Sequence, residues 1–314
     1  MNIALVFFVR LWSEHMSIPV IDFDSFKNES ELAVVLDENL QRFGFVLARN
    51  IGMDFGLKDA VMEVVQSFFS EETSKKMNHA YEGTSNNFGY QGALTEKLDP
   101  KQYPDIKETF TMRNLTGRAD DLRAWPDAVY RQLSLEFYDN CQQCAFNVLR
   151  IFAIALGADR DYFVAKHSGE NITMRYLHYP AFGYECSSPS QMGAGSHTDY
   201  GAITLLLQDN VGGLQLKLPS GVWLDVPHIE GTVVINTGDL MQIWSNDRYP
   251  STEHRVLPRL GFRDRYSIAF FTDPDSEVLV TPLASCVADG RRPNYSPVTA
   301  GDHILAKLNA AQIT

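Results

Sequence analysis

Apolar residues recur along the first half of the chain at the spacing of one helical face. In Glu29–Phe43 they stand at Leu32, Val35, Leu36 and Leu40, three or four positions apart, which is typical of an amphipathic helix. The same reasoning predicts other elements before residue 170: helices over Gly56–Phe69, from Ser70 and over Trp125–Gly157, strands over Ile18–Phe23 and Gly44–Arg49, and a long loop over Tyr81–Lys101. Because this loop is rich in aromatic residues, we expect it to be functional rather than disordered.

From about Asn171 onward the pattern changes to short β-rich runs separated by Gly, Pro, Asn and Asp. We predict strands over Asn171–Tyr179, Ala202–Gln208, Leu214–Leu218, Thr232–Thr237, Glu253–Val256 and Arg265–Phe271. Short, evenly spaced strands favour a sandwich or barrel, and a double-sheet jelly roll covers most strand edges while it leaves an open mouth. The pattern therefore predicts a mixed α and β fold, with a jelly-roll core flanked by helices from the N-terminal half.

Three parts of the chain are expected to differ in role. Residues 1–15 are apolar but too short to span a membrane and lack the features of a signal peptide, so we expect a disordered or non-native extension before Met16. Residues 16–170 form a mainly helical region, and residues 171–314 form the catalytic jelly roll. No linker divides these two regions, so we expect one integrated unit.

Composition excludes several classes of partner. The chain has 27 Lys and Arg against 39 Asp and Glu, a net charge of −12, and no long basic run, so it lacks the electrostatic footprint that nucleic acids require. Anionic membrane surfaces are excluded for the same reason. Cys141 and Cys144 form a C-x-x-C inside a predicted helix, which favours packing over redox or metal chemistry. Reduced thiols are typical of a cytoplasmic location, and no protein partner is evident.

One histidine and one aspartate stand out as candidate metal ligands. His197 and Asp199 lie two residues apart at the start of a predicted strand, and residues i and i+2 of an extended segment share a face. His-x-Asp also occurs in ordinary surface turns, so a third ligand is needed, and His254 in a later predicted strand supplies it. Two histidines and one carboxylate form the facial triad of non-haem Fe(II) enzymes, whereas a structural zinc site takes four protein ligands.

A second pair of residues, one arginine and one serine, suggests a site that binds an anion, which we call the clamp. Arg265 and Ser267 open an apolar strand and share one face. A buried guanidinium binds a carboxylate through two parallel hydrogen bonds, and a serine hydroxyl donates a third. Alternatively, Arg265 forms a solvated ion pair with Asp264 or Glu253.

Nine short motifs along the chain, taken together in their order and spacing, resemble those of a known family. They are Ile18-Pro-Val-Ile-Asp-Phe, Gly44-Phe-Val-Leu, Asn87-Phe-Gly-Tyr-Gln-Gly, Ile106-Lys-Glu-Thr-Phe, His197-Thr-Asp-Tyr-Gly, Gly212-Gly-Leu-Gln-Leu, Asn236-Thr-Gly-Asp, Ser251-Thr-Glu-His-Arg-Val and Arg265-Tyr-Ser. The chain from Ile18 onward resembles the 2-oxoglutarate- and Fe(II)-dependent dioxygenases, in particular the isopenicillin N synthase-like group. The resemblance implies a distorted double-stranded β-helix, or jelly-roll, core.

The resemblance also implies roles for single residues. His197, Asp199 and His254 would hold iron, and Arg265 and Ser267 would anchor the distal carboxylate of 2-oxoglutarate. Tyr179 would hydrogen-bond the co-substrate. Many relatives carry Asn where this chain has Leu177, which leaves the second co-substrate contact open. Arg175, on the same strand face, could reach the site or form a structural ion pair.

The activity implied is the oxidative decarboxylation of 2-oxoglutarate coupled to hydroxylation, desaturation or ring closure of a small organic molecule. It requires Fe(II), O2 and 2-oxoglutarate, with ascorbate as a candidate reductant. The expected substrate contacts are Arg175, Phe88, Tyr90, Phe110, Met192 and Phe270. Two alternatives remain open: an oxidase of the same fold that does not use 2-oxoglutarate, since such relatives share the Arg-x-Ser pair, and a non-catalytic binding protein. Sequence alone identifies neither the substrate nor the oligomeric state.

Overall fold

The fold is built around a large, mostly antiparallel sheet. The computed structural model describes residues 17–99, 101–118, 124–181, 191–258 and 263–312, so the predicted extension at residues 1–15 lies outside the described residues. The strands of the main sheet follow the order β1-β2-β10-β7-β12-β5-β4-β3. Their bounds are β1 Val20–Asp22, β2 Phe45–Arg49, β3 Phe88–Gln91, β4 Glu108–Arg113, β5 Thr173–Tyr179, β7 Ile203–Gln208, β10 Val233–Thr237 and β12 Arg265–Thr272.

A smaller sheet faces part of the main one. Its order is β6-β11-β8-β9, with β6 Ala194–His197, β8 Leu214–Lys217, β9 Trp223–Asp225 and β11 His254–Val256. A short pair, β13 Leu279–Val280 and β14 Val298–Thr299, lies apart from both. The two sheets form the predicted jelly-roll core.

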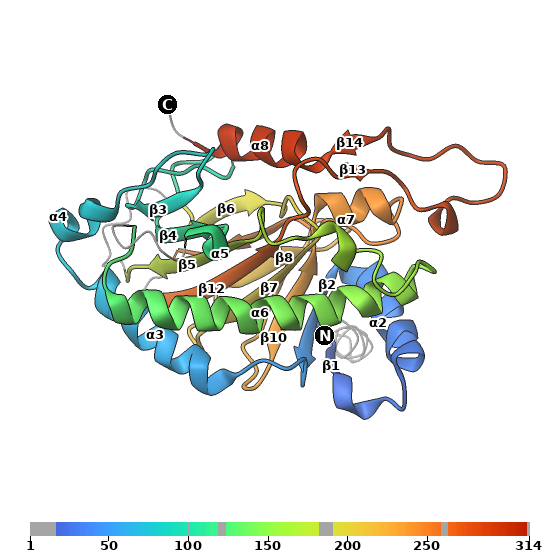
Figure 1. Cartoon of the computed structure of the whole chain (residues 1–314), viewed down its shortest axis with the longest axis horizontal. Coiled ribbons are helices and arrows are strands. Elements are labelled where there is room, and N and C mark those ends of the chain that lie inside the picture. The colour runs from blue at the N-terminus through green and yellow to red at the C-terminus, as the bar shows by residue number, and fades with distance from the viewer. Residues whose placement is uncertain (1–16, 100, 119–123, 182–190, 259–262, 313–314) are drawn as a thin grey trace, which may run out of the picture.

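Helices α2, α3 and α6 cover the outer face of the main sheet. The helices of the described residues are α2 Glu29–Phe43, α3 Phe55–Phe69, α4 Thr73–Lys76, α5 Leu115–Arg118, α6 Ala128–Ala155, α7 Asp239–Trp244 and α8 Ala300–Ala311, with 3-10 turns η1 Phe23–Ser25, η2 Met77–His79, η3 Val164–Lys166 and η4 Ala284–Cys286. Figure 1 shows α6 lying along this face, with α3 beside it and α8 at the opposite edge of the molecule. None of the helices in the described part of the chain is long and apolar enough to cross a lipid bilayer.

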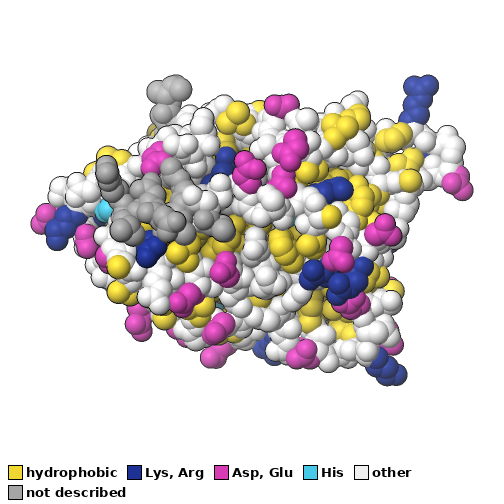
Figure 2. Space-filling model, in the orientation of Figure 1, with side chains coloured by type: hydrophobic (Ala, Val, Ile, Leu, Met, Phe, Trp, Pro, Cys, Tyr) yellow, Lys and Arg dark blue, Asp and Glu magenta, His cyan; other side chains and the backbone are white. Residues whose placement is uncertain are grey.

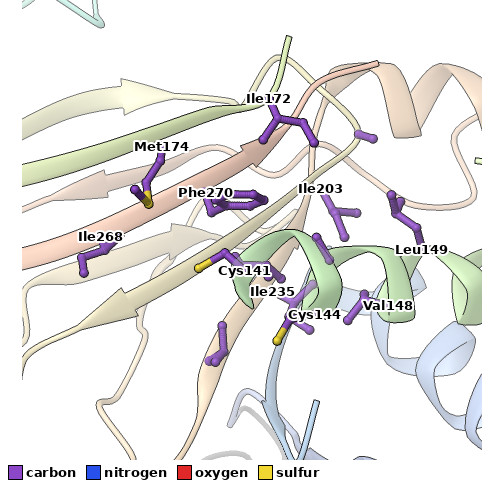
Figure 3. Packing of buried hydrophobic residues seen from close by; sticks show 14 of the residues in the cluster. Cys141, Cys144, Val148, Leu149, Ile172, Met174, Ile203, Ile235, Ile268 and Phe270 are labelled. Atoms are coloured by element: carbon purple, nitrogen blue, oxygen red, sulfur yellow. The ribbon is translucent and has the colours of Figure 1, made fainter. Parts of the chain in front are cut away.

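Local sequence explains why α6 starts where it does. The Asp127 side chain accepts a hydrogen bond from the backbone N–H of Tyr130 at 2.8 Å, which satisfies one of the free donors at a helix start. Cys141 and Cys144 are buried and unpaired on this helix, and Figure 3 shows them among the packed side chains of the core. Burial raises the pKa of the Cys144 thiol to about 11, so both cysteines contribute packing rather than reactivity.

The N-terminal region contributes more strand than the pattern predicted. β3 and β4 were not predicted as strands, yet they extend the main sheet at one edge, and β3 falls inside the expected loop Tyr81–Lys101. β3 contains Gly89, where an added Cβ would come within 2.7 Å of the Ala80 carbonyl oxygen. A glycine at a close backbone approach weakens the apolar signal of a strand. Pairing with β4, rather than local preference, therefore decides this element.

Acidic residues are spread over the surface. On the face shown in Figure 2, the described Asp and Glu side chains are interspersed with Lys and Arg, and the basic side chains form no continuous stripe.

Candidate active site

The smaller sheet brings the two candidate histidines side by side, with their ring centres 4.3 Å apart. β11 pairs antiparallel with β6, and His254 is the register partner of His197. The Nε2 atom of His254 lies 3.6 Å, and that of His197 4.0 Å, from Oδ1 of Asp199. One ligand atom from each of the three residues falls within 4.8 Å of the others. Residues separated along the chain thus form one cluster that can hold a metal ion.

Backbone carbonyls orient both imidazoles. Nδ1 of His197 lies 2.7 Å from the Gly195 carbonyl oxygen, and Nδ1 of His254 lies 3.1 Å from that of Thr252. Because a carbonyl only accepts, each Nδ1 carries the proton and each Nε2 keeps its lone pair for a metal. Burial and the neighbouring His254 lower the pKa of His197 well below its ordinary value, which favours the neutral ring that a metal ligand requires.

The Asp199 carboxylate is oriented by two donors that the sequence analysis missed. Its Oδ2 accepts hydrogen bonds from the Thr204 hydroxyl at 2.5 Å and from Nδ2 of Asn236 at 2.6 Å. This leaves Oδ1 facing the two histidines. A set of two imidazoles and one carboxylate suits Fe(II) with open positions for other ligands. The donor chemistry of the described residues therefore fits a non-haem iron.

The guanidinium of Arg265 is fully buried and lacks an anionic partner. Its Nη atoms donate to Ser267 Oγ and Gln208 Oε1 at 3.2 Å each. The Cζ atom of Arg265 lies 4.7 Å from the centre of the Tyr179 ring. The Nε atom of Arg265 has no hydrogen-bond partner. Within the described residues Arg265 forms no ion pair, because Asp264 bonds His178 and Glu253 bonds Lys217. The alternative of a solvated ion pair is therefore not what the structure shows.

One cavity joins the clamp to the metal cluster. Alternate residues of two neighbouring strands line it: Arg265, Ser267, Ala269 and Phe271 with Asp273 beyond the end of β12, and Thr173, Arg175, Leu177 and Tyr179 of β5. His197, Asp199 and His254 line it as well. The cavity thus follows one face of the main sheet, and the metal cluster opens onto it.

Arg175 forms a structural ion pair and also borders the cavity, and its contact with the substrate stays a prediction. Its Nη2 lies 2.8 Å from Oε2 of Glu96 and its Nε donates to the Thr111 hydroxyl at 3.0 Å. The same side chain lines the cavity. Glu96 also pairs with Lys107 at 3.2 Å, so Arg175 belongs to a buried network that borders the site. Leu177 lines the cavity with an apolar surface.

The structure places five expected substrate contacts away from this cavity, which corrects that expectation. Phe88, Tyr90, Phe110 and Phe270 are at most 1% exposed and belong to the core on the helix-covered side of the main sheet. Figure 3 shows Phe270 beside Cys141 of α6. Met192 lines a separate surface pocket with Trp223. Strand alternation explains the error, since Phe271 and not Phe270 shares the face of Arg265.

Several residues that line the cavity were missed. They are Asn87, Glu96, Lys107, Arg113, Tyr200, Asp273, Ile304 and Leu308. Extending the two-residue period of β12 from Arg265 and Ser267 would have reached Asp273. Ile304 and Leu308 lie on α8, which was not predicted, so no local pattern placed them at the site.

Two family profiles match the chain. The profile of the 2OG-Fe(II) oxygenase superfamily matches residues 169–274, and that of the non-haem dioxygenase in morphine synthesis N-terminal region matches residues 18–128. The first match contains His197, Asp199, His254, Arg265 and Ser267.

Whole-length relatives agree with these matches. A 2-oxoglutarate-Fe(II) type oxidoreductase of Emericella nidulans is 33% identical, with 91% of this chain and 88% of that protein covered. Feruloyl CoA ortho-hydroxylase 1 of Arabidopsis thaliana is 30% identical over 92% of this chain and 78% of its own length. The crystal structure of a full-length Neurospora crassa protein in complex with alpha-KG and thymine superposes with a TM-score of 0.83 at 32% identity, covering 93% of this chain and 96% of that one.

Proposed function

Because the chain belongs to the 2-oxoglutarate- and Fe(II)-dependent oxygenase superfamily, we propose that His197, Asp199 and His254 hold its ferrous ion. Arg265, Ser267 and Tyr179 hold the 2-oxoglutarate. When bound, iron and co-substrate supply the oxidising chemistry: 2-oxoglutarate, O2 and a substrate C–H give succinate, CO2 and a C–OH. Hydroxylation is the outcome that we assign to this chain.

The buried guanidinium of Arg265 is the observation that supports this proposal most strongly. A charge removed from water costs several kcal/mol unless an opposite charge compensates it. No carboxylate of the described chain does so for Arg265. A dicarboxylate co-substrate supplies the missing anion, and its planar carboxylate matches the fork of the guanidinium.

The surrounding residues orient the co-substrate and exclude water. Ser267 offers a hydroxyl beside the guanidinium at 3.2 Å, and the Tyr179 ring lies against it at 4.7 Å. Leu177, Leu206 and Leu214 line the same part of the cavity with apolar side chains. An apolar wall strengthens the charge pair because it lowers the local dielectric. Leu177 thus contributes water exclusion where many relatives have a polar contact.

We assign the primary substrate to the class of small organic molecules. The cavity extends beyond the metal cluster to Thr173 and Asp273, which leaves room for a second ligand next to the co-substrate. A related structure holds thymine together with alpha-KG, and this supports a substrate of similar size here.

Substitution of Arg265 tests the proposal. We expect Arg265→Met to weaken 2-oxoglutarate binding by about 10- to 150-fold, because charge-assisted hydrogen bonds contribute roughly 1.5–3 kcal/mol. The affinity is measured by titrating the Fe(II)-loaded protein with 2-oxoglutarate without oxygen and monitoring the metal-to-ligand absorption band of the complex. Arg255→Met is the control, since Arg255 bonds Gln215 at 2.8 Å and stacks on Trp223 outside the cavity.

Succinate formation from labelled 2-oxoglutarate is the second readout. Equal affinities in the Arg265 variant and the wild type would contradict the clamp. Substrate oxidation without any labelled succinate would instead indicate an oxidase that takes its electrons from the substrate.

A further inference from the structure

The end of the cavity opposite Arg265 carries two charged side chains that the co-substrate does not use. Asp273 directly follows β12, and Arg113 is the last residue of β4; both line the cavity with Thr173. Since the clamp lies at the other end of β12, these residues border the space left for the primary substrate. This inference therefore rests on the function proposed above.

Asp273 is a buried carboxylate without a partner. Asp273 is 6% exposed. In the described part of the chain no group donates a hydrogen bond to its carboxylate, and it forms no ion pair. Oδ1 lies against the backbone of Gly201, where an added Cβ would come within 1.9 Å of it. Burial raises the pKa of Asp273 to about 7. Native structures rarely leave such a group unsatisfied unless a ligand or water completes it.

Arg113 is the second charged residue at this end of the cavity. Its Nε has one weak contact, 3.5 Å to the Thr173 hydroxyl, and no carboxylate of the described residues pairs with it. Arg113 and Ile304 line both this cavity and a hollow at the surface formed with Asn86, Asn114 and Ser276. Arg113 therefore borders both the cavity and the surface hollow.

The two groups share one cavity, and the charge of Arg113 lowers the pKa of Asp273, yet no hydrogen bond or close ion pair joins them among the described residues. Opposite charges in a partly buried site attract strongly, and a group inserted between them takes a hydrogen bond from one and gives a hydrogen bond to the other. The neighbouring Arg175 is already neutralised by Glu96 at 2.8 Å. Arg113 and the ionised form of Asp273 together leave this end without net charge, which disfavours dicarboxylates and polyamines and favours a neutral or zwitterionic ligand.

We propose that Asp273 and Arg113 determine substrate specificity, and that the substrate carries an N–H donor next to an oxygen acceptor. Asp273 accepts from the N–H group, and Arg113 donates to the oxygen. A cyclic amide and an α-amino acid both have this chemistry. A compound that lacks the N–H leaves the buried Asp273 carboxylate unpaired, which is a strong form of discrimination in a pocket.

Matched pairs of compounds test the assignment. Five- and six-membered cyclic amides are compared with their N-methyl derivatives, and α-amino acids with their N-trimethyl betaines. The readout is the release of labelled succinate above the rate without added compound. We expect stimulation only by compounds with an N–H. A response to cyclic amides identifies a neutral substrate, and a response to amino acids identifies a zwitterionic one.

Variants then connect the response to the two side chains. Asp273→Asn keeps the shape but replaces the acceptor oxygen, and we expect it to raise the half-saturating concentration of the stimulating compound about 10- to 150-fold. Arg113→Met is expected to do the same through the oxygen acceptor. Asp225→Asn is the control, because Asp225 lies on β9 and bonds Gln215 at 2.8 Å.

Three results would overturn the proposal: equal stimulation by N–H and N-methyl compounds, an unchanged half-saturating concentration in both variants, or no stimulation by any N–H compound. The affinity of wild-type protein for 2-oxoglutarate is measured in parallel. Loss of that binding would refute the proposed function itself, whereas normal binding with any of the three results refutes only the specificity assignment.

Discussion

At the residue scale, the site depends on hydrogen bonds that orient the side chains of the three candidate metal ligands. Asp199 presents one oxygen to the two histidines because its other oxygen already accepts from Thr204 and Asn236. The histidines present Nε2 because backbone carbonyls hold Nδ1. Such supporting hydrogen bonds commonly contribute as much to a metal site as the choice of ligand.

Asn236→Ala is expected to weaken metal binding without removing a ligand. Loss of the 2.6 Å hydrogen bond frees the Asp199 carboxylate to rotate, and we expect the affinity for Mn(II), a redox-stable substitute for Fe(II), to fall about 10- to 100-fold. Isothermal titration calorimetry measures it. Asn39→Ala is the control, since Asn39 bonds only within α2. An Mn(II) affinity equal to that of wild type would show that Thr204 alone orients the carboxylate.

At the scale of elements, strand alternation separates two environments. Along β12, Arg265, Ser267 and Phe271 line the cavity, whereas Ile268 and Phe270 pack into the helix-covered core. Both faces are buried, so a single strand connects packing on one side with chemistry on the other. The junction between α2 and β2 lies close to the segment that leads into His254. Gly44 ends α2 there with φ of 63°.

Gly44→Ala should destabilise the fold by more than the cost of placing an alanine in a left-handed backbone conformation. A left-handed conformation costs a non-glycine residue about 1 kcal/mol. At Gly44 a Cβ would also lie 2.4 Å from the Pro250 carbonyl oxygen and 2.8 Å from the Thr252 hydroxyl. We expect a loss of roughly 3 kcal/mol in the free energy of unfolding, measured by urea denaturation.

Gly231→Ala is the matched control for this prediction. Gly231 has a φ of 71°, but nothing lies within 4 Å of an added Cβ. The free energy of unfolding should therefore fall by only about 1 kcal/mol in the Gly231→Ala variant. Equal losses at the two positions would mean that the Pro250 segment moves aside easily.

At the scale of the whole molecule, buried carboxylates tie the N-terminal region to the sheet. Glu96 pairs with Arg175 and Lys107, and Glu108 bonds Lys76, Tyr90 and His178. Burial alone would raise both pKa values, but these partners outweigh it and lower the pKa of each carboxyl to about 2. The folded state therefore binds protons more weakly at these groups than the unfolded chain does.

Stability should consequently fall in acid. Because the folded pKa values lie below the ordinary value of 4.5, the contribution is complete above about pH 4.5 and is lost as the pH falls toward 2. For Glu108 it amounts to at most about 3 kcal/mol. Glu108→Gln should therefore be less stable than wild type at neutral pH, with the difference shrinking toward pH 2. Urea unfolding at several pH values measures this.

A comparison with an exposed glutamate shows whether the hydrogen-bonding partners of Glu108 are the cause. Glu63 lies exposed on α3, and Glu63→Gln should leave the pH profile unchanged. Parallel profiles for wild type and Glu108→Gln would contradict the linkage.

Local pattern was sufficient for the regular elements. The helices α2, α3 and α6 and the strands β5, β7, β8, β10, β11 and β12 lie where periodicity predicts them, because each has an apolar face or run that is visible in a short window. Local pattern was insufficient for β3, β4, β6, β9 and α8, which are short or depend on their neighbours for pairing and burial.

By itself, the sequence determined the class of protein: the order and spacing of the His197, Asp199, His254 and Arg265 motifs identify the family and its cofactors. Only the tertiary structure decided which side chains border the substrate. Both faces of the main sheet are buried, so hydrophobicity does not distinguish core from cavity, and the aromatic residues chosen from the sequence lie in the core. Asp273 and Arg113 come from strands far apart in the chain, and only the pairing of β12, β5 and β4 places them in the same cavity.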